Sequence, residues 1–278
     1  MTTSFPLVPA CVAAMFLLAA TAQAADAADA PDAASPSPAA ADDGGPPVVP
    51  YRPSVSTPAQ LSAPGYLELE AGGLRASGPD RGASRFTLPY TLKLAFTPDW
   101  GIRVGGDAWV REVDGPGDAH KGGGDTSVVL KRRFAVSDAT AWGLELGEKF
   151  PTAGSTLGSG HADTTVNGIF SSDFAPSWHA DLNLNETRLG VPSGEPRQWQ
   201  TGWAASFSRA LTDAWGASGE LSGTHQQSVA NTAQALFAAS WNASPAAVFD
   251  FGYARGLTDA SPHNQFFAGV TVRLAKVF

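Results

Sequence analysis

The sequence predicts an all-β protein, a transmembrane antiparallel β-barrel of about twelve strands that spans residues 65–278. Apolar and polar residues alternate with a period of two in one segment after another, which is typical of strands with one apolar face. Short turns alternate with longer, glycine-rich loops, as they do in bacterial outer-membrane barrels. Aromatic residues gather where the segments meet the short turns, which is where an interfacial aromatic girdle forms.

Composition narrows the class of protein. Of the 278 residues, 43% are hydrophobic and only 16% are charged, and the formal net charge is −8. An acidic chain lacks the basic face that nucleic-acid binding requires, so we expect no nucleic-acid partner. A single cysteine excludes a disulfide framework and a multi-cysteine metal site. No stretch after residue 25 has the roughly 20 consecutive apolar residues of a transmembrane helix.

The N-terminal region divides into two expected parts. Residues 1–24 are expected to be a signal peptide, because an apolar run over 11–22 ends in the cleavable pattern Ala22-Gln23-Ala24. Residues 25–64 contain nine of the 21 prolines, together with many Ala, Asp and Ser residues. Such a composition buries little apolar surface, so we expect a disordered periplasmic linker before the barrel.

The closing segment, 266–278, shows the alternation clearly. One phase holds Phe266, Val270 and Leu274, whereas the other holds Thr271 and Arg273. A helix would instead place apolar residues three and four positions apart. About twelve segments of roughly ten residues share this pattern, and that is the length of a tilted strand that crosses a bilayer. They begin near Gly65, Ser84, Gly101, Asp125, Ala141, Asp163, Trp178, Trp199, Trp215, Thr232, Ala246 and Gln265.

The connections between these segments alternate in length. An even number of strands places both chain ends on the short-turn side, which is the periplasmic side of an outer-membrane barrel. Four tryptophans at the short turns, Trp100, Trp142, Trp178 and Trp215, are expected to form one girdle. Short turns are expected at 97–100, 137–140, 175–177, 211–213 and 244–245, and longer loops at 76–83, 112–124, 151–162, 190–198, 226–231 and 257–264.

The phase opposite the apolar one is expected to face the lumen, because charges facing lipid at mid-depth are costly. Most charges of the barrel segments fall on this phase, with both signs present. Glu145 and Lys149 share it and are expected to pair, and loops 112–124 and 151–162 are long enough to fold inward as a gate. The candidate lumen and selectivity residues are Arg103, Arg111, Lys131, Arg133, Glu145, Lys149, Asp181 and Arg273.

Four stretches resemble a known family, the outer-membrane transporters of the phenol-degradation (MetA) pathway. These stretches are Gly124-Asp125 before SVVLKRRF, LELGEKFPTAG at 144–154, NLNET at 183–187, and the closing FFAGVTVRLAKVF. The resemblance covers about 65–278 and rests on the order and spacing of the stretches. It implies an outer-membrane channel for small molecules, aromatic ones among them, and it carries no binding residues with it.

Two alternatives to a channel remain. A barrel hydrolase needs a nucleophile, a base and an orienting group within hydrogen-bond reach. The five histidines lie in or near loops and turns, and no G-x-S-x-G or H-E-x-x-H motif occurs. We therefore expect no catalytic residues, no cofactor and no metal. The second alternative is a structural barrel whose lumen is plugged by its own side chains.

The sequence therefore predicts a porin-like channel in a Gram-negative outer membrane, with both termini in the periplasm. Its function would be passive diffusion of small molecules through a narrow, charged lumen. The expected partners are outer-membrane lipids and the barrel-assembly machinery, which would recognise the C-terminal strand that ends at Phe278.

Overall fold

The structure is a computed structural model and describes residues 44–78, 82–114, 119–153, 157–196 and 198–278, which belong to one compact unit. Within these ranges no helix is long and apolar enough to cross a membrane. The strands in the described ranges are β1 (Tyr66–Ser77), β2 (Ser84–Ala95), β3 (Trp100–Val113), β4 (Ala119–Gly122), β5 (Thr126–Ala135), β6 (Thr140–Phe150), β7 (Asp163–Ala175), β8 (Trp178–Leu189), β9 (Gln198–Ala210), β10 (Trp215–Gln226), β11 (Thr232–Ser244), β12 (Ala247–Gly256) and β13 (Asn264–Lys276).

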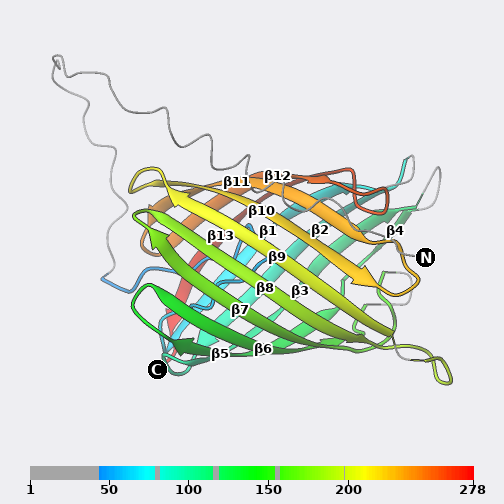
Figure 1. Cartoon of the computed structure of the whole chain (residues 1–278), viewed down its shortest axis with the longest axis horizontal. Coiled ribbons are helices and arrows are strands. Elements are labelled where there is room, and N and C mark those ends of the chain that lie inside the picture. The colour runs from blue at the N-terminus through cyan, green and yellow to red at the C-terminus, as the bar shows by residue number, and fades with distance from the viewer. Residues whose placement is uncertain (1–43, 79–81, 115–118, 154–156, 197) are drawn as a thin grey trace, which may run out of the picture. The chain divides into compact units, whose positions relative to one another are not determined.

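Twelve of these strands close into a single antiparallel barrel (Figure 1). Consecutive long strands pair with each other, and β13 pairs with β1 to complete the ring. The predicted fold class is therefore confirmed, and each predicted strand start lies close to the observed one. The alternation was informative because residues of one phase share one face of the sheet.

The short strand β4 was not predicted. Residues 112–124 were expected to be a loop, but Ala119–Gly122 pairs with Val110–Val113 at the far end of β3. The first half of β3, Trp100–Gly106, which follows the short turn, pairs with β5 instead. This hairpin lengthens the wall beyond the neighbouring strands, so the described part of this loop extends the barrel end instead of folding into the lumen.

A bulge interrupts the pairing of β2 with β3. Leu88 pairs with Trp109 and Pro89 with Asp107, so Ala108 is an extra residue in β3. Proline cannot donate to the ladder, and an irregularity is expected where it stands within a strand. The extra residue reverses which phase of β3 faces inward beyond this point.

The outer face of the barrel is apolar and the inner face is polar. In β6, Leu144 and Leu146 are 47% and 54% exposed, whereas Glu145 between them is 4% exposed. In β7 and β8, Val166 and Leu184 are likewise exposed, although both belong to the apolar phase. An exterior of this kind would be unstable in water but is suited to a lipid surface.

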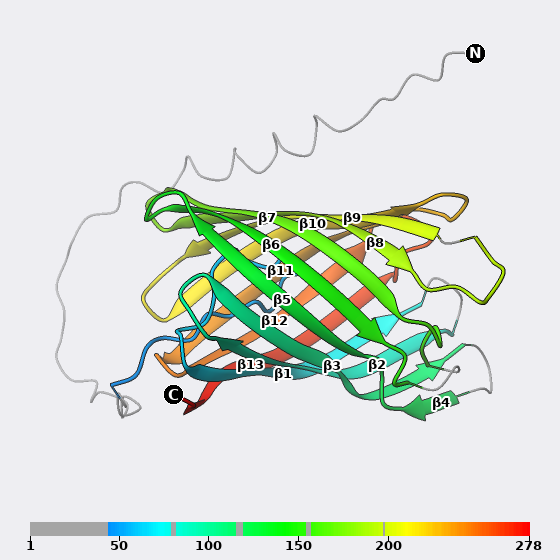
Figure 2. The same ribbon diagram turned by 90° about the horizontal axis from the view of Figure 1, so that it is seen from below.

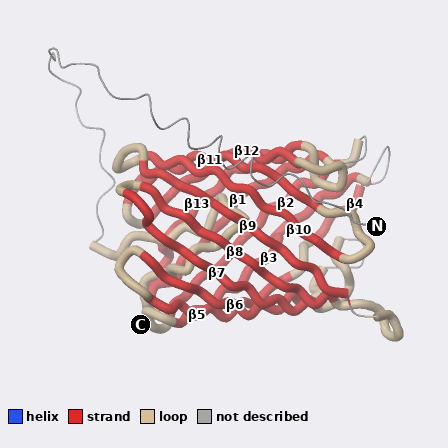
Figure 3. The backbone as a smooth tube through the Cα atoms, viewed as in Figure 1, coloured by secondary structure: helices blue, strands red, loops and turns tan. Residues whose placement is uncertain are grey.

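The short turns lie together at one end of the barrel (Figure 3). Aromatic side chains lie at the strand ends beside them. Trp142 contacts Phe170 with ring centroids 4.9 Å apart, and Trp215 stacks on Trp241 at 6.3 Å. Arg132 lies over the ring of Trp100 at 5.0 Å, so its charge stays at the rim. These rings and the neighbouring basic groups match the composition of a membrane interface.

Residues 44–64, called here the inner segment, enter the barrel at its short-turn end (Figure 2). This differs from the expectation of a disordered linker over 25–64, of which 25–43 lie outside the described residues. Tyr51 and Ala59 are 5% and 0% exposed. The composition argument failed here because the segment is ordered by polar contacts with the barrel wall and not by an apolar core of its own.

Candidate functional site

The candidate site is the lumen at the short-turn end of the barrel, where charged side chains of the wall meet the inner segment. On one side, Lys93 of β2 lies between two glutamates of β1. Its Nζ is 3.0 Å from Oε2 of Glu68 and 2.7 Å from Oε1 of Glu70. All three side chains are at most 5% exposed. They are paired and buried, as charges removed from water must be.

A second charged cluster lies across β3, β5 and β6. Arg103 Nη2 is 2.9 Å from Oε1 of Glu145, and Lys131 Nζ is 3.4 Å from the same oxygen. Asn167 of β7 donates from Nδ2 to Oε2 of Glu145 at 3.0 Å. Glu145 thus accepts contacts from β3, β5 and β7, which fixes its carboxylate on the inner wall.

The wall carboxylates accept backbone N–H groups of the inner segment. Val49 N–H lies 3.3 Å from Oε1 of Glu68, and Tyr51 N–H donates to Oε1 of Glu70 at 2.6 Å. The segment has no strand partner for these donors, so the carboxylates replace the ladder of a sheet. Further along, Glu220 of β10 accepts from Val55 N at 3.2 Å, from Ser56 N at 2.9 Å and from Ser56 Oγ at 2.9 Å.

Wall donors complete the attachment by reaching carbonyl groups of the inner segment. Lys93 donates to the carbonyl of Val49, and Lys131 to that of Pro58. Across the lumen, Ala59 N–H donates to Oγ of Ser171 in β7 at 2.7 Å. The segment is therefore bound on several sides by side chains that point inward from the strands.

Tyr51 stands at the centre of the basic groups. The ammonium nitrogens of Lys93 and Lys131 each lie 4.3 Å from its ring centroid, and Cζ of Arg103 lies 5.3 Å away. Its hydroxyl donates to the carbonyl of Gln60 at 2.7 Å, which closes the segment into a loop. Burial raises the pKa of the Tyr51 phenol, so the ring remains neutral and attracts the cations through its π face.

A cavity of about 440 Å³ lies beside the inner segment, at the short-turn ends of β8 to β12. Ser54 and Ser56 line it on the segment side, and Ser206, Ser218 and Asp181 line it on the wall side. The inner segment therefore does not fill this end of the barrel completely. A cavity of this size and polarity is large enough for a small molecule.

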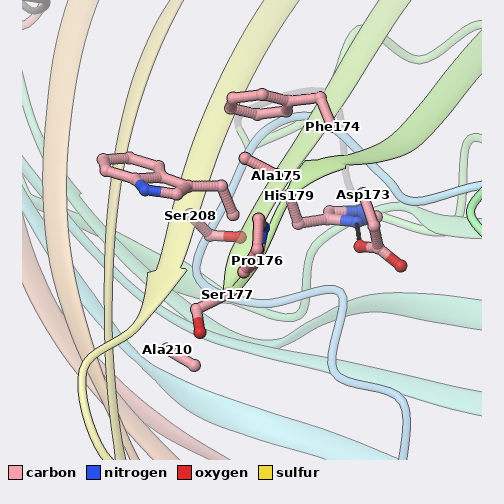
Figure 4. A pocket seen from close by; sticks show the side chains of 9 residues that line it. Asp173, Phe174, Ala175, Pro176, Ser177, His179, Ser208 and Ala210 are labelled. Atoms are coloured by element: carbon pink, nitrogen blue, oxygen red, sulfur yellow. Dashed lines mark hydrogen bonds and ion pairs between the residues drawn. The ribbon is translucent and has the colours of Figure 1, made fainter.

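Asp181 and His179 form a separate group at the turn between β7 and β8. His179 Nδ1 is 2.6 Å from Oδ1 of Asp173, and its Nε2 is 3.0 Å from Oδ1 of Asp181. A pocket of about 690 Å³ lies at this turn. Figure 4 shows His179 beside Asp173, with Ser208 across from them. Both imidazole nitrogens are bound to carboxylates, so neither is available as a general base.

The far end of the lumen is organised differently. Lys149 Nζ is 2.8 Å from Oδ2 of Asp163 and 3.2 Å from Oδ2 of Asp125. The predicted pair between Glu145 and Lys149 was therefore wrong, since each residue pairs elsewhere. Four positions along one strand separate them by about 13 Å, too far for a salt bridge.

One predicted lumen residue lies on the other face. Arg111 stands opposite Phe86, which is exposed on the apolar outer side, whereas its neighbour Glu112 pairs inward with Arg85 at 2.8 Å. The prediction for Arg111 was wrong because the bulge at Ala108 moves the inward phase of β3 by one residue.

The other candidate residues fall into groups. Arg103, Lys131 and Glu145 come together in the second charged cluster, and Arg273 donates to the carbonyl of Pro46 in the inner segment. Arg133 is half-buried nearer the rim. The candidate set lacked Lys93, Glu68, Glu70, Glu220 and Asp250, which hold the inner segment although they lie on the predicted inward phase.

The fold is similar to that of several solved outer-membrane β-barrels. An outer-membrane channel from Pseudomonas putida F1 superposes with a TM-score of 0.61 at 11% identity, over 77% of this chain and 97% of that one. The NanC porin gives 0.55 at 12% identity, over 75% and 100%. The KdgM porin, solved in complex with disordered oligogalacturonate, gives 0.53 at 7% identity, over 75% and 99%. No family model and no curated protein matches the sequence.

Proposed function

We propose that the chain is an outer-membrane channel for passive diffusion of small molecules, and that the inner segment closes its lumen reversibly. The proposal rests on how the inner segment is attached to the barrel wall, which is through polar contacts. Carboxylates of the wall accept backbone N–H groups of the segment, and wall cations donate to its carbonyl groups. Water or a polar solute can replace each of these contacts.

Little apolar surface holds the inner segment in place. The cluster of buried apolar residues that includes the segment consists of Ala59, Ala141 and Ile169. The buried apolar side chains of the segment include Val48, Tyr51 and Ala59, and so few side chains bury far less apolar surface than a packed core does. Segments with few apolar contacts open at low free-energy cost, which is what a gate requires.

The apolar exterior and the aromatic rim support placement in an outer membrane, with the short turns and both termini of the barrel toward the periplasm. In this orientation the inner segment blocks the periplasmic mouth. The neighbours of the fold are channels and porins, which supports transport over catalysis. Both nitrogens of His179 are occupied, which removes the base that a hydrolase at that turn would need.

A reversible cross-link tests this proposal directly. Ser54 Oγ of the inner segment lies 3.4 Å from Ser206 Oγ of β9, so Ser54→Cys with Ser206→Cys should form a disulfide between segment and wall. The background carries Cys11→Ser. In planar bilayers we expect silence under oxidising conditions and discrete conductance steps after reduction. The Ser54→Cys single variant is the control and should be insensitive to reduction.

The plugged structural barrel is the second candidate, and the number of polar contacts to the inner segment favours it. It predicts that the double-cysteine protein is silent in both redox states while remaining folded. That result would contradict the channel proposal. Heat-dependent migration on gels reports whether the barrel is folded.

Aromatic solutes form the finer part of the proposal. The resemblance to the phenol-degradation transporters suggests them, and the position of Tyr51 supports them, since a phenol ring already lies over Lys93 and Lys131. A free phenol could compete for these cations and release the segment. We expect p-cresol to raise the open fraction of the channel, and 4-methylcyclohexanol, which has no π face, to leave it unchanged. Equal effects of the two compounds would remove the aromatic part of the proposal.

A further inference from the structure

Arg52 of the inner segment makes a two-pronged contact with the wall. Its Nε is 3.1 Å from Oδ2 of Asp250, and its Nη2 is 3.1 Å from Oδ1 of the same carboxylate. The Asp250 side chain is 3% exposed and that of Arg52 is 17% exposed. This fork-to-fork geometry matches the planar guanidinium group and is not available to a compact ammonium group.

Two glycines form the surface on which this guanidinium lies. Gly72 of β1 and Gly269 of β13 face each other in register, and Asp250 of β12 is the partner of Gly269 on the other side. A Cβ on Gly72 would lie 2.8 Å from Nη2 of Arg52, and one on Gly269 would lie 2.6 Å from it. Either side chain would occupy the space of the guanidinium. The paired glycines and the carboxylate thus form a cradle across three adjacent strands.

The charges around the cradle favour a cation. The wall carboxylates that meet this part of the inner segment are Glu68, Glu70, Glu145, Glu220 and Asp250, and the wall cations are Lys93, Arg103, Lys131 and Arg273, so carboxylates exceed cations by one. Lys93 already pairs with both glutamates of β1. Without Arg52, the Asp250 carboxylate would lose its two charge-assisted hydrogen bonds in a nearly buried position, which is unfavourable.

We propose that Gly72, Gly269 and Asp250 form a binding site for the guanidinium group of a small solute, and that Arg52 is its resident occupant. A solute that enters the lumen takes the place of Arg52 and thereby removes one of the contacts that hold the inner segment. The proposal rests on the channel function and names a class of solute for it, small guanidinium compounds.

Chemical rescue of an emptied cradle tests the site without measuring transport. Arg52→Ala removes the atoms that ethylguanidinium contains, so this compound should fill the space left. We expect ethylguanidinium to bind the folded Arg52→Ala protein in detergent at least about tenfold more tightly than ethylammonium does, by titration calorimetry. Addition of Asp250→Asn should abolish this preference, whereas Asp163→Asn, which removes a carboxylate at the far end of the lumen, should preserve it.

Equal binding of the two compounds, or no binding of either to folded Arg52→Ala protein, would overturn the proposal. Folding of each variant is checked by heat-dependent migration on gels, and Arg52→Lys serves as a second variant that keeps the charge but not the fork. Rescue should also occur in Arg52→Lys protein, more weakly, because the introduced ammonium group competes for Asp250.

Conductance separates the two proposals. If ethylguanidinium binds the Arg52→Ala protein and every variant stays silent in bilayers, the channel function fails and the cradle remains. If the variants conduct and ethylguanidinium does not bind, the channel remains and the cradle fails.

Discussion

The two ends of the lumen hold their charges in different ways. At the short-turn end, Lys131 is fully buried and Lys93 is 2% exposed, and both donate to the inner segment. At the long-loop end, Lys149 is 28% exposed and pairs with Asp125, Asp163 and Ser159 of the wall and loops. Charges of the first kind depend on an occupant of the lumen, whereas charges of the second kind are kept in place by hydration and by their own neighbours.

The largest expected effect comes from breaking a buried pair at the short-turn end. Lys131→Met leaves Glu145 with one cation fewer in a buried site, so the free energy of unfolding should fall by about 3 kcal/mol. Urea titration of the detergent-folded protein measures it. Lys149→Met is the matched control at the long-loop end and should cost less than about 1 kcal/mol. Similar losses in the two variants would show that the two ends do not differ.

The next largest effect is expected on the fraction of time for which the channel is open. Glu220→Gln weakens three hydrogen bonds to the inner segment without removing atoms from the wall. A loss of about 1.4 kcal/mol in segment binding raises the open fraction about tenfold. Single-channel recording measures this fraction. The control is Glu186→Gln, whose carboxylate accepts from Thr201 at 2.7 Å. It should leave gating unchanged, and an equal change in both variants would contradict the assignment of Glu220 to the gate.

The smallest expected effect concerns ion preference. Arg103→Ala with Arg273→Ala removes two of the basic groups that line the short-turn end. The reversal potential in a salt gradient should shift toward cations by some millivolts, because the lumen loses two positive charges. Arg111→Ala, on the outer face, is the control and should not shift it. Unchanged reversal potentials in the double variant would discard these residues as determinants of selectivity.

The barrel was predictable from the sequence because a period of two is a local signal. In β6, the alternation of Leu144, Glu145 and Leu146 correctly predicts that the leucines point outward and the glutamate points inward. The signal failed at the bulge by Ala108, where β3 departs from the period, and this displaced Arg111. Proline at position 89 marked an irregularity, but the sequence does not tell whether the partner strand gains a residue.

The site was less predictable for a different physical reason. A proline-rich, polar segment has no periodicity to show that it is ordered, and its partners lie far away in the sequence. Tyr51 contacts Lys93 and Lys131, and Ser56 contacts Glu220. These residues are far apart in the sequence, and the closed barrel brings them together. The many charges on the inward phase of the strands were the available signal in the sequence. A lumen lined by so many paired charges needs either water or a polar occupant.

The inner segment binds on both sides of the pairing between the first and last strands of the barrel, β1 and β13. The segment reaches β1 through Glu70, β12 through Asp250 and β13 through Arg273, so its contacts straddle the point where the ring closes. Its docking surface is complete only when the C-terminal strand is paired with the N-terminal one. The final strand pairing therefore both closes the wall and brings together the side chains that bind the inner segment at β1, β12 and β13.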